Sequence, residues 1–584
     1  MPGVDVKECE TRMADQGMTR REVLGRLPVV VTAAATTLMY DGDLDAEAVR
    51  PGRSLDVNNL GVKVYNIRNY GAKGDGKSFD SSPLQRAIDT CHTDGGGTVL
   101  VPAGTFLIGS TELKSNVTLH IAAGATLLGI ADGTQYPPVN EVPLQGDATL
   151  RDGNRALLFA VGATNITIEG EGTIDGQGAL FYPSVPGLVG GSKPGDLRRP
   201  YHLMLYRCER VTLRDLALVN CAYHSVRVIQ SRRIHIDNIY MYNRKNVNCD
   251  GFHFISVEHV TLSNCIVYVQ DDACAMFGSS KFITITNCFF STRWSVFRFG
   301  GGIAEDITVS NCICKQVYGC PIKLQGNRGA RFENISFANL LLDDVTGPIY
   351  ISMGPNSDHP VNPGLTPDTA VEPLGPPTAR NISFSHISGT VTTNPGQIPD
   401  MPPASNPGRP GERFSCITLN AVGDALIENI SFSDIKLTFG GGGSQEVAAR
   451  RVLPEVAGEY FLLGAMPAYG FYARNSSGIT LDNVRFQLSS PDLRPSLILD
   501  HVEDVAIHGL QVQSDPSSES ALRFIDTKDV LLGATRLLTQ AGVFLELEGA
   551  DNRNITVDGG DISKAKIPAA FNAGALSSMV RFRS

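Results

Sequence analysis

Glu258-His-Val-Thr-Leu-Ser-Asn-Cys-Ile-Val-Tyr268 returns as Lys281-Phe-Ile-Thr-Ile-Thr-Asn-Cys-Phe-Phe290 and again as Glu305-Asp-Ile-Thr-Val-Ser-Asn-Cys-Ile-Cys314. Within each copy, apolar and polar residues alternate as they do in a half-buried β-strand. The central copies follow one another every 23 to 26 residues. No long amphipathic helix separates them, so a sheet of alternating strands and helices is excluded.

Further copies of this repeat extend over most of the chain. They begin at Glu209, Arg233, Arg380, Glu428, Ser477, Asp504 and Arg553. Repeats of this length cannot bury a core alone and must stack on their neighbours. The sequence therefore predicts an all-β solenoid, a right-handed parallel β-helix of roughly a dozen coils over residues 115–565. A β-propeller is the alternative, but each of its blades needs about 40 residues.

An Asn-Cys pair recurs at one position of the repeat, at Asn220, Asn264, Asn287 and Asn311. We expect the asparagines to form an internal stack and the cysteines that follow them to fill the core as free thiols. The chain has 12 cysteines but no cysteine or histidine cluster with zinc spacing. We therefore predict neither a metal nor another cofactor.

The first 48 residues are predicted to be an N-terminal extension with an export signal. Arg20 and Arg21 precede a short apolar run, Leu27–Ala35, as in a bacterial twin-arginine export signal. That run is too short to span a membrane. We expect an exported, periplasmic or extracellular protein, with residues 49–584 forming a single β-helix domain that carries long loop inserts.

A short helix is expected at the start of that domain. Residues 70–76 form a glycine-rich turn, and Ser82 and Pro83 suit the N-cap and first position of a helix over Leu84–Cys91. Such a helix would cap the open end of the solenoid and keep other strands from pairing with it.

Three carboxylates occupy equivalent places on two successive repeats. Asp250 lies in Asn248-Cys249-Asp250-Gly251, and Asp271 and Asp272 follow Gln270. Stacked repeats would turn all three to one face, where they cannot all ionise cheaply, so their proton affinities separate. An acid beside bases is what cleavage of a glycosidic bond requires. Acids on solvated turns are the alternative.

Other side chains accompany these acids. Alternation would turn Trp294, Val296 and Arg298 to one face, where Trp294 can stack on a sugar and Arg298 can hold an anion. His224 lies on the preceding rung, and alternation places His253 beside Asp250 rather than with it. Structural roles are the alternatives for Trp294, Arg298 and both histidines.

Charge is unevenly distributed along the chain. The formal net charge is -10, yet residues 198–331 carry 17 Lys and Arg against 9 Asp and Glu. A basic midsection around acids suggests an acidic or sugar-rich ligand, with solvated faces as the alternative. The acidic chain lacks the basic stripe of a nucleic-acid-binding protein. We expect a monomer that acts on a polysaccharide, without a nucleic-acid or membrane partner.

Three linked motifs resemble glycoside hydrolase family 28, the polygalacturonases and rhamnogalacturonases: Asn69–Gly76, Gly95–Phe106 and Ile168–Gly178. The resemblance covers about residues 60–350 and implies a right-handed parallel β-helix that cleaves pectic chains with inversion. The family's Asn-Thr-Asp resembles Asn248-Cys249-Asp250, and its Gly-Asp-Asp resembles Gln270-Asp271-Asp272. The resemblance implies that Asp271 is the general acid and that Asp250 and Asp272 activate water.

Two family motifs are altered. The His-Gly motif should fall near Arg293–Ser295, where no histidine stands, and the Arg-Ile-Lys motif reads Pro321-Ile322-Lys323. A lone lysine cannot reproduce the two-pronged grip of an arginine on a carboxylate. We therefore expect a rhamnogalacturonan-type linkage rather than plain homogalacturonan, with Lys323, Arg298, Trp294, His253, His224 and Asn248 contacting substrate.

Two other functions stay open. A polysaccharide lyase would bind calcium through the acids and abstract a proton with Lys323 or Arg298. A non-catalytic carbohydrate-binding β-helix would explain the altered motifs.

Overall fold

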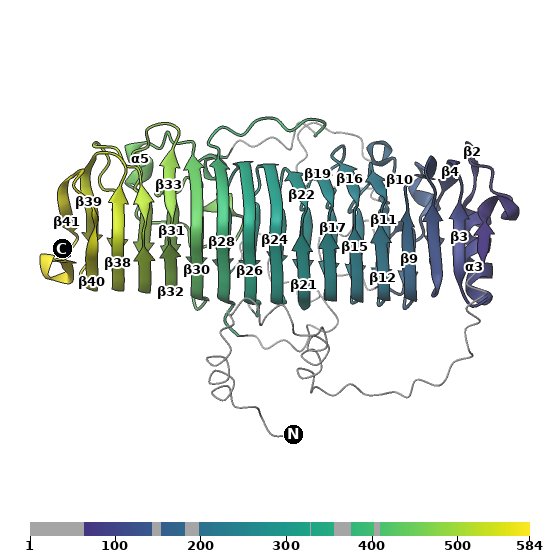
Figure 1. Ribbon diagram of the computed structural model, residues 1–584, viewed down its shortest axis with the longest axis horizontal. Helices are drawn as coiled ribbons and strands as arrows, with labels where there is room; N and C mark the ends of the chain where they lie inside the picture. Colours follow the sequence, from purple (N-terminus) through teal and green to yellow (C-terminus); the bar gives the residue numbers. More distant parts are fainter. Residues whose placement is uncertain are drawn as a thin grey trace, which may run out of the picture. The chain divides into compact units, whose positions relative to one another are not determined.

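The protein is described by a computed structural model that covers residues 63–142, 154–181, 198–327, 329–355, 375–401 and 409–583. Val62–Ser584 forms one compact unit in which parallel strands are stacked side by side, with α3 at one end and β41 near the other (Figure 1). The predicted right-handed parallel β-helix is confirmed. The predicted start of the domain at residue 49 and the signal region lie outside the described residues.

Many of the coils are built from three short strands. In the coil that follows Asp250, these are β18 (Glu258–Ser263), β19 (Ile266–Val269) and β20 (Cys274–Phe277). The third strand of every coil joins a 15-stranded sheet, hereafter the site sheet, and the first two strands join a 27-stranded sheet. From β24 (Ile303–Val317) the first two strands of several coils run on as one.

The strands of the site sheet are β5 (Thr111–Glu112), β8 (Ala156–Val161), β11 (Tyr201–Tyr206), β14 (Val226–Ile229), β17 (Phe252–Ile255), β20, β23 (Phe297–Gly300), β25 (Ile322–Gly326), β27 (Ile349–Met353), β29 (Ile417–Ala421), β31 (Phe471–Arg474), β34 (Leu497–Asp500), β37 (Leu522–Ile525), β39 (Ala541–Glu548) and β41 (Ala565–Asn572).

The other strands are β1 (Val64–Asn66), β2 (Asp75–Phe79), β3 (Gly97–Val101), β4 (Gly104–Ile108), β6 (Val117–Ile121), β7 (Ala125–Gly129), β9 (Thr164–Gly170), β10 (Thr173–Asp175), β12 (Glu209–Arg214), β13 (Ala217–Val219), β15 (Arg232–Asp237), β16 (Tyr240–Asn243), β18, β19, β21 (Ser280–Thr286), β22 (Phe289–Thr292), β24, β26 (Arg331–Val345), β28 (Thr378–Val391), β30 (Leu426–Phe439), β32 (Ser477–Asp482), β33 (Arg485–Leu488), β35 (Glu503–His508), β36 (Gln511–Val512), β38 (Lys528–Leu537), β40 (Arg553–Asp561) and β42 (Val580–Arg583).

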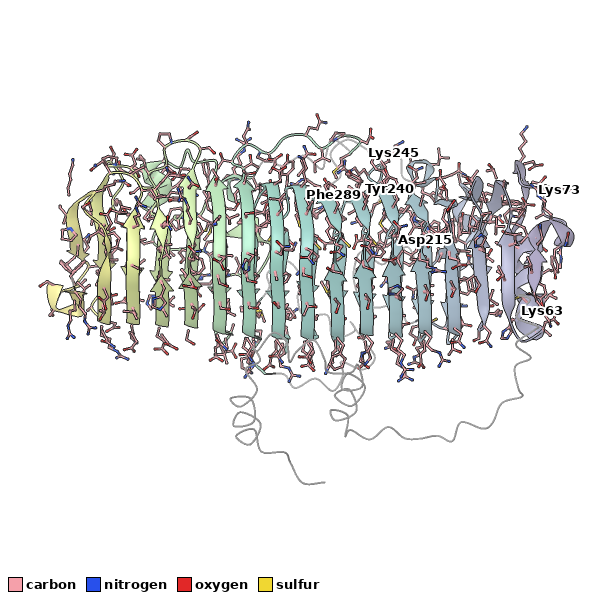
Figure 2. The ribbon with its side chains drawn as sticks, viewed as in Figure 1. Lys63, Lys73, Asp215, Tyr240, Lys245 and Phe289 are labelled. Atoms are coloured by element: carbon pink, nitrogen blue, oxygen red, sulfur yellow. The ribbon has the colours of Figure 1, made fainter. Side chains whose placement is uncertain are left out.

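The alternating pattern of the repeats separates core from surface. Inward side chains such as Val260 and Leu262 are fully buried, whereas Tyr240 on the outer face keeps 44% of its surface exposed. Figure 2 shows Tyr240 and Phe289 among the side chains on that outer face. Aromatic residues also stack from coil to coil inside the core, as Phe384 does on Phe432 with ring centroids 4.8 Å apart.

The predicted internal asparagine stack is wrong. Asn264, Asn287 and Asn311 have φ near +55° at the bend between two strands, and their side chains are exposed. Asparagine suits this left-handed backbone because its short side chain can bond locally. Asn264 donates to the carboxylate of Asp237 at 2.7 Å, and Asn339 donates to Asn311, also at 2.7 Å.

The cysteines after these asparagines behave as predicted. Cys221, Cys265, Cys288 and Cys312 are buried and free, as are the other cysteines in the part of the chain that the structure describes. Small apolar packing explains their recurrence.

The N-terminal capping helix is α3 (Ser81–Thr93), which buries Leu84, Ala87 and Ile88. Its N-cap is Asp80 rather than the predicted Ser82. The Asp80 carboxylate accepts hydrogen bonds from the backbone N–H groups of Lys73 and Gly74, and so holds the glycine-rich turn against the helix. Within the described ranges, no helix is long and apolar enough to cross a membrane.

A segment over residues 443–466, hereafter the wall segment, covers part of the outer face of the site sheet. It contains the short helices α5 (Gln445–Ala448) and η8 (Tyr460–Leu463). Its buried side chains pack with outward residues of the sheet in one cluster that includes Leu453, Tyr460, Tyr350, Tyr472 and Ile498. The wall segment therefore closes the surface beyond β25 on the C-terminal side. The remaining short helices are η2 (Ile67–Tyr70), η3 (Gly133–Gln135), η5 (Gly178–Leu180), α4 (Pro410–Arg413) and η9 (Ser577–Met579).

Candidate active site

The three predicted acids lie in the turns that lead into two neighbouring strands of the site sheet. Asp250 comes two residues before β17, and Asp272 two residues before β20. The turns are joined by backbone hydrogen bonds, from the N–H of Gly251 to the carbonyl of Asp272 at 2.9 Å and from the N–H of Asp271 to the carbonyl of Cys249 at 3.3 Å. Stacking of the coils thus brings Asp250 next to Asp271 and Asp272.

Gly251 permits this close approach. A Cβ at this position would lie 2.4 Å from the carbonyl oxygen of Ala273, inside any allowed contact. A side chain here would force the two turns apart.

Asp271 is the member of the trio whose pKa is raised. Removal from water raises the pKa of this carboxyl well above its usual range, and the charges of Asp250 and Asp272 raise it further. The backbone N–H of Asp272 and the charge of Lys323 oppose the rise. A carboxyl with a raised pKa beside two others is the arrangement that supplies an acid and bases in one site.

Two histidines lie next to the Asp250 carboxylate. The Nδ1 atom of His253 lies 3.1 Å from Oδ2 of Asp250, and Nε2 of His224 lies 3.6 Å from Oδ1. The prediction that His253 would stand beside Asp250 rather than with it is wrong. Strand alternation does not apply, because Asp250 lies in the turn and β17 begins only at Phe252. Burial, with the neighbouring charges of His253 and Arg227, lowers the pKa of His224 well below its usual value.

The donor types of His224, Asp250 and His253 also suit a transition metal, since one ligand atom from each lies within 4.8 Å of the others. The two imidazole rings are nearly parallel, however, at 13° and with centroids 4.6 Å apart. In-plane lone pairs of stacked rings run parallel instead of meeting at one point. The arrangement fits two groups that hold a carboxylate better than it fits an ion.

Arg298 and Trp294 border the acids on the next coil. The Nε atom of Arg298 lies 4.0 Å from Oδ2 of Asp272, and the backbone N–H of Ser295 donates to the other oxygen of Asp272 at 3.0 Å. Trp294 is half-buried. Val296, predicted to share their face, points into the core instead, because it lies in the turn before β23.

Lys323 follows Arg298 in the same outward row, since β23 pairs with β25 in that register. Its ammonium group is bound by both carboxylate oxygens of Glu459, at 2.8 and 3.1 Å. Lys323 is only 1% exposed. Asn248 is likewise engaged, because its side-chain oxygen accepts a hydrogen bond from Arg199 at 3.3 Å.

Sequence reasoning missed three charged residues at this site. Arg227 precedes His253 in the outward row and is 1% exposed, with Nη1 bonded to the hydroxyl of Tyr201. Alternation along β14 was the signal that could have revealed it. Glu412 and Glu459 come from segments far along the chain, so no local pattern announces them.

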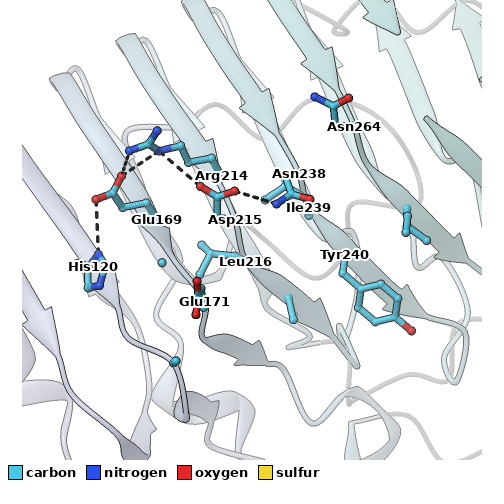
Figure 3. A pocket seen from close by; sticks show the side chains of 14 residues that line it. His120, Glu169, Glu171, Arg214, Asp215, Leu216, Asn238, Ile239, Tyr240 and Asn264 are labelled. Carbon is cyan, nitrogen blue, oxygen red and sulfur yellow. Dashed lines mark hydrogen bonds and ion pairs between the residues drawn. The ribbon is translucent and has the colours of Figure 1, made fainter. Parts of the chain in front are cut away.

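A groove on the other sheet holds none of the predicted site residues. This groove of about 710 Å³ is lined by His120, Glu169, Glu171, Arg214, Asp215 and Tyr240, among others. Figure 3 shows Arg214 between Glu169 and Asp215, with Asp215 also bonded to Asn238. These two carboxylates are paired with a neighbouring arginine.

A parallel β-helix with three clustered carboxylates, one of them with a raised pKa, defines a class of protein equipped for acid–base chemistry on a sugar chain. Residues 91–399, more than half of the chain, match the model of glycosyl hydrolases family 28. The chain belongs to this family, as the motifs suggested.

Individual relatives agree with that assignment. A probable polygalacturonase of Vitis vinifera is 30% identical over 320 residues, which cover 52% of this chain and 61% of the relative. An exo-poly-alpha-D-galacturonosidase of Dickeya chrysanthemi is 26% identical over 382 residues, covering 56% and 63%. The chain thus spans about three fifths of the length of these relatives.

Among solved structures, an exopolygalacturonase from Thermotoga maritima superposes with a TM-score of 0.51 at 21% identity. The match covers 64% of this chain and 87% of the other. At this identity the likeness supports the β-helix fold alone.

Proposed function

We propose that the protein hydrolyses a glycosidic bond of a pectic polysaccharide by an inverting acid–base mechanism. The observation that carries this proposal is the trio of carboxylates on adjacent coils, among which Asp271 has the raised pKa. Asp271 would give a proton to the departing glycosidic oxygen. Asp250 and Asp272 would take a proton from the water whose oxygen bonds to the anomeric carbon on the opposite face.

His253 and Arg298 support this division of roles. His253 holds Asp250 through Nδ1, and Arg298 stands beside Asp272. Each of these two carboxylates thus has a donor or a cation beside it. Among the described side chains, none forms an ion pair with Asp271. We therefore assign the role of the acid to Asp271.

The names of the relatives bear on the substrate. Those quoted are galacturonan-degrading enzymes, so family and relatives favour a galacturonan. The sequence-based preference for a rhamnogalacturonan-type linkage runs against these names, and rests on the altered Arg-Ile-Lys motif. Both polymers belong in the test.

The experiment is a screen of the purified protein on homogalacturonan, rhamnogalacturonan and neutral pectic side chains. We expect new reducing ends from one of them, with no gain in ultraviolet absorbance. An unsaturated product absorbing in the ultraviolet would instead reveal a lyase. Retention of a polymer without any cleavage would favour the binding-protein alternative.

A further inference from the structure

A row of apolar side chains crosses the outer face of the 27-stranded sheet. Equivalent outward residues on five successive coils are register partners in turn, and these residues, hereafter the outer row, are Tyr240, Ile266, Phe289, Ile313 and Leu341. Phe289 is half-buried, and the other four keep between 41% and 45% of their surface exposed. Neighbouring strands lie about 4.8 Å apart, so the outer row is about 19 Å long. Apolar residues on a protein surface usually stand singly, and a contiguous set indicates a binding surface.

A line of amide side chains runs beside the outer row. Two residues before each member of the row, the chain bends at an exposed asparagine: Asn238, Asn264, Asn287, Asn311 and Asn339. The asparagines of the Asn-Cys repeat belong to this line. The bonds that Asn264 and Asn339 donate to neighbouring coils each need one N–H of an amide that has two. Each coil therefore presents one apolar side chain and one amide in the same arrangement.

An aromatic ring widens the outer row near one end. Tyr268 is half-buried, and its ring centroid lies 5.3 Å from that of Phe289 and 6.4 Å from that of Tyr240. Aromatic and aliphatic side chains in a line suit the apolar faces of successive sugar rings. Amides beside them suit the hydroxyl groups at the edges of those rings.

The outer row leads into the groove described above. Tyr240 and Ile266 are among the residues that line this groove, as is Asn264 (Figure 3). The titratable acids and bases of its lining are three carboxylates, one arginine and one histidine: Glu169, Glu171, Asp215, Arg214 and His120. An excess of carboxylates disfavours an anionic ligand such as a galacturonan.

Lys315 and Arg244 lie beside the outer row. Lys315 is paired with Asp343 at 2.9 Å. Arg244 is buried against the ring of Tyr268, with the guanidinium carbon 4.8 Å from the ring centroid. The charge of the lysine is thus shared with a carboxylate, and that of the arginine is covered. An uncharged ligand suits this surface better than an anion.

The outer row is too narrow for a stable contact with another folded protein. Such an interface needs about 800 Å² from each partner. Five side chains in single file, each less than half exposed, fall well short of that area. Across the line of amides, the next outward residues on two of these coils are the polar Thr286 and Ser310. A ligand with the shape of a chain fits the row better than a second copy of the protein.

We propose that the outer row and its line of amides form a second carbohydrate site, which binds an uncharged, extended polysaccharide of the β-1,4-glucan type. The hydroxyls of such a chain lie at the ring edges, so both faces of each ring are apolar. The site lies on a different sheet from the acids and would tether the protein to an insoluble polymer that the acids do not cleave. This inference does not depend on the hydrolytic proposal.

Co-sedimentation with microcrystalline cellulose tests this second site. Galacturonan oligosaccharides are added in excess to occupy the site with the acids, and we expect the wild type to bind cellulose in their presence. Tyr240→Ser/Ile266→Ser should weaken this binding roughly tenfold or more, because it removes the apolar contact on two adjacent coils.

The matched control is Phe282→Ser/Leu531→Ser. It also replaces one aromatic and one aliphatic side chain on outward positions, with exposed fractions of 45% and 38%, but away from the outer row. The control should bind cellulose as the wild type does. Both variants should keep the wild-type melting temperature and the wild-type rate on a soluble polymer.

Three results would overturn the proposal. One is a wild type that does not bind cellulose, or a folded Tyr240→Ser/Ile266→Ser protein that binds it without loss. Another is release of the bound protein by galacturonan oligosaccharides, which would locate the binding at the acids. The third is a dimer in sedimentation equilibrium that Tyr240→Ser/Ile266→Ser dissociates, since a second copy would then cover the outer row. Each result leaves the hydrolytic proposal untouched, because that proposal concerns the acids of the site sheet.

Discussion

At the scale of single residues, the three acids differ because their surroundings differ. Asp271 lies beside two other carboxylates and is partly removed from water, and its pKa rises. Asp250 is held by His253, and Asp272 accepts the Ser295 N–H and lies beside Arg298. Identical side chains thus have different partners, which is the basis for the different roles that we propose for them.

Because its pKa is raised in the folded state, Asp271 lowers the free energy of unfolding at pH values above its ordinary pKa. Its folded-state pKa is raised, so its contribution to stability is fully present below the unfolded pKa and is lost as the pH rises through the folded value. Asp271→Asn removes this loss. We expect the melting temperature of Asp271→Asn to exceed that of the wild type more at pH 7 than at pH 4, by calorimetry. A difference that shrinks with rising pH would contradict the raised pKa.

Residue types near the site were predicted from the sequence, but their contacts were not. The acids, Arg298 and Trp294 were found because each follows or lies on a recognisable repeat. The bond between His253 and Asp250 was missed, since one lies on a strand and the other in a turn. The engagement of Lys323 by Glu459 was missed because it joins residues 136 positions apart.

At the scale of elements, strands obeyed alternation and turns did not. Arg298 faces outward on β23 as predicted, whereas Val296, one residue before that strand, enters the core. The prediction of an internal asparagine stack is wrong for the same reason. The asparagines occupy left-handed bends, where the side chain points to solvent. Backbone conformation at a bend depends on single residues rather than on a period.

The wall segment shows a second limit of prediction from the sequence. Its sequence carries no repeat, and its place over the site sheet follows from packing against Tyr350, Tyr472 and Ile498. Neither the two-residue alternation of a strand nor the repeat of about 24 residues can predict such long-range packing. Glu459, which holds Lys323, comes from this segment.

At the scale of the whole molecule, the repeat alone was sufficient to predict the fold. Each coil can bury its apolar face only against its neighbours, so the period of the sequence becomes the period of the structure. The acids then meet because equivalent positions on successive coils are adjacent in space. Family membership confirms the class that this geometry indicates.

Export concerns the chain as a whole. We propose that Arg20 and Arg21 direct the protein across a bacterial membrane through a receptor that reads paired arginines. Replacing both by lysine keeps the charge and removes the recognised pair. We expect the variant to accumulate in the cytoplasm, by cell fractionation and immunoblotting. Export at the wild-type level would show that another signal operates.

The central claim is that Asp271 is the acid of a hydrolytic site, and turnover by Asp271→Asn tests it most directly. On the polymer that the wild type cleaves, we predict a loss of about 10²–10⁴-fold in kcat, the usual worth of general acid–base help. The control is Asp424→Asn, at an exposed turn, which should keep wild-type activity. Full activity in a folded Asp271→Asn protein would contradict the account.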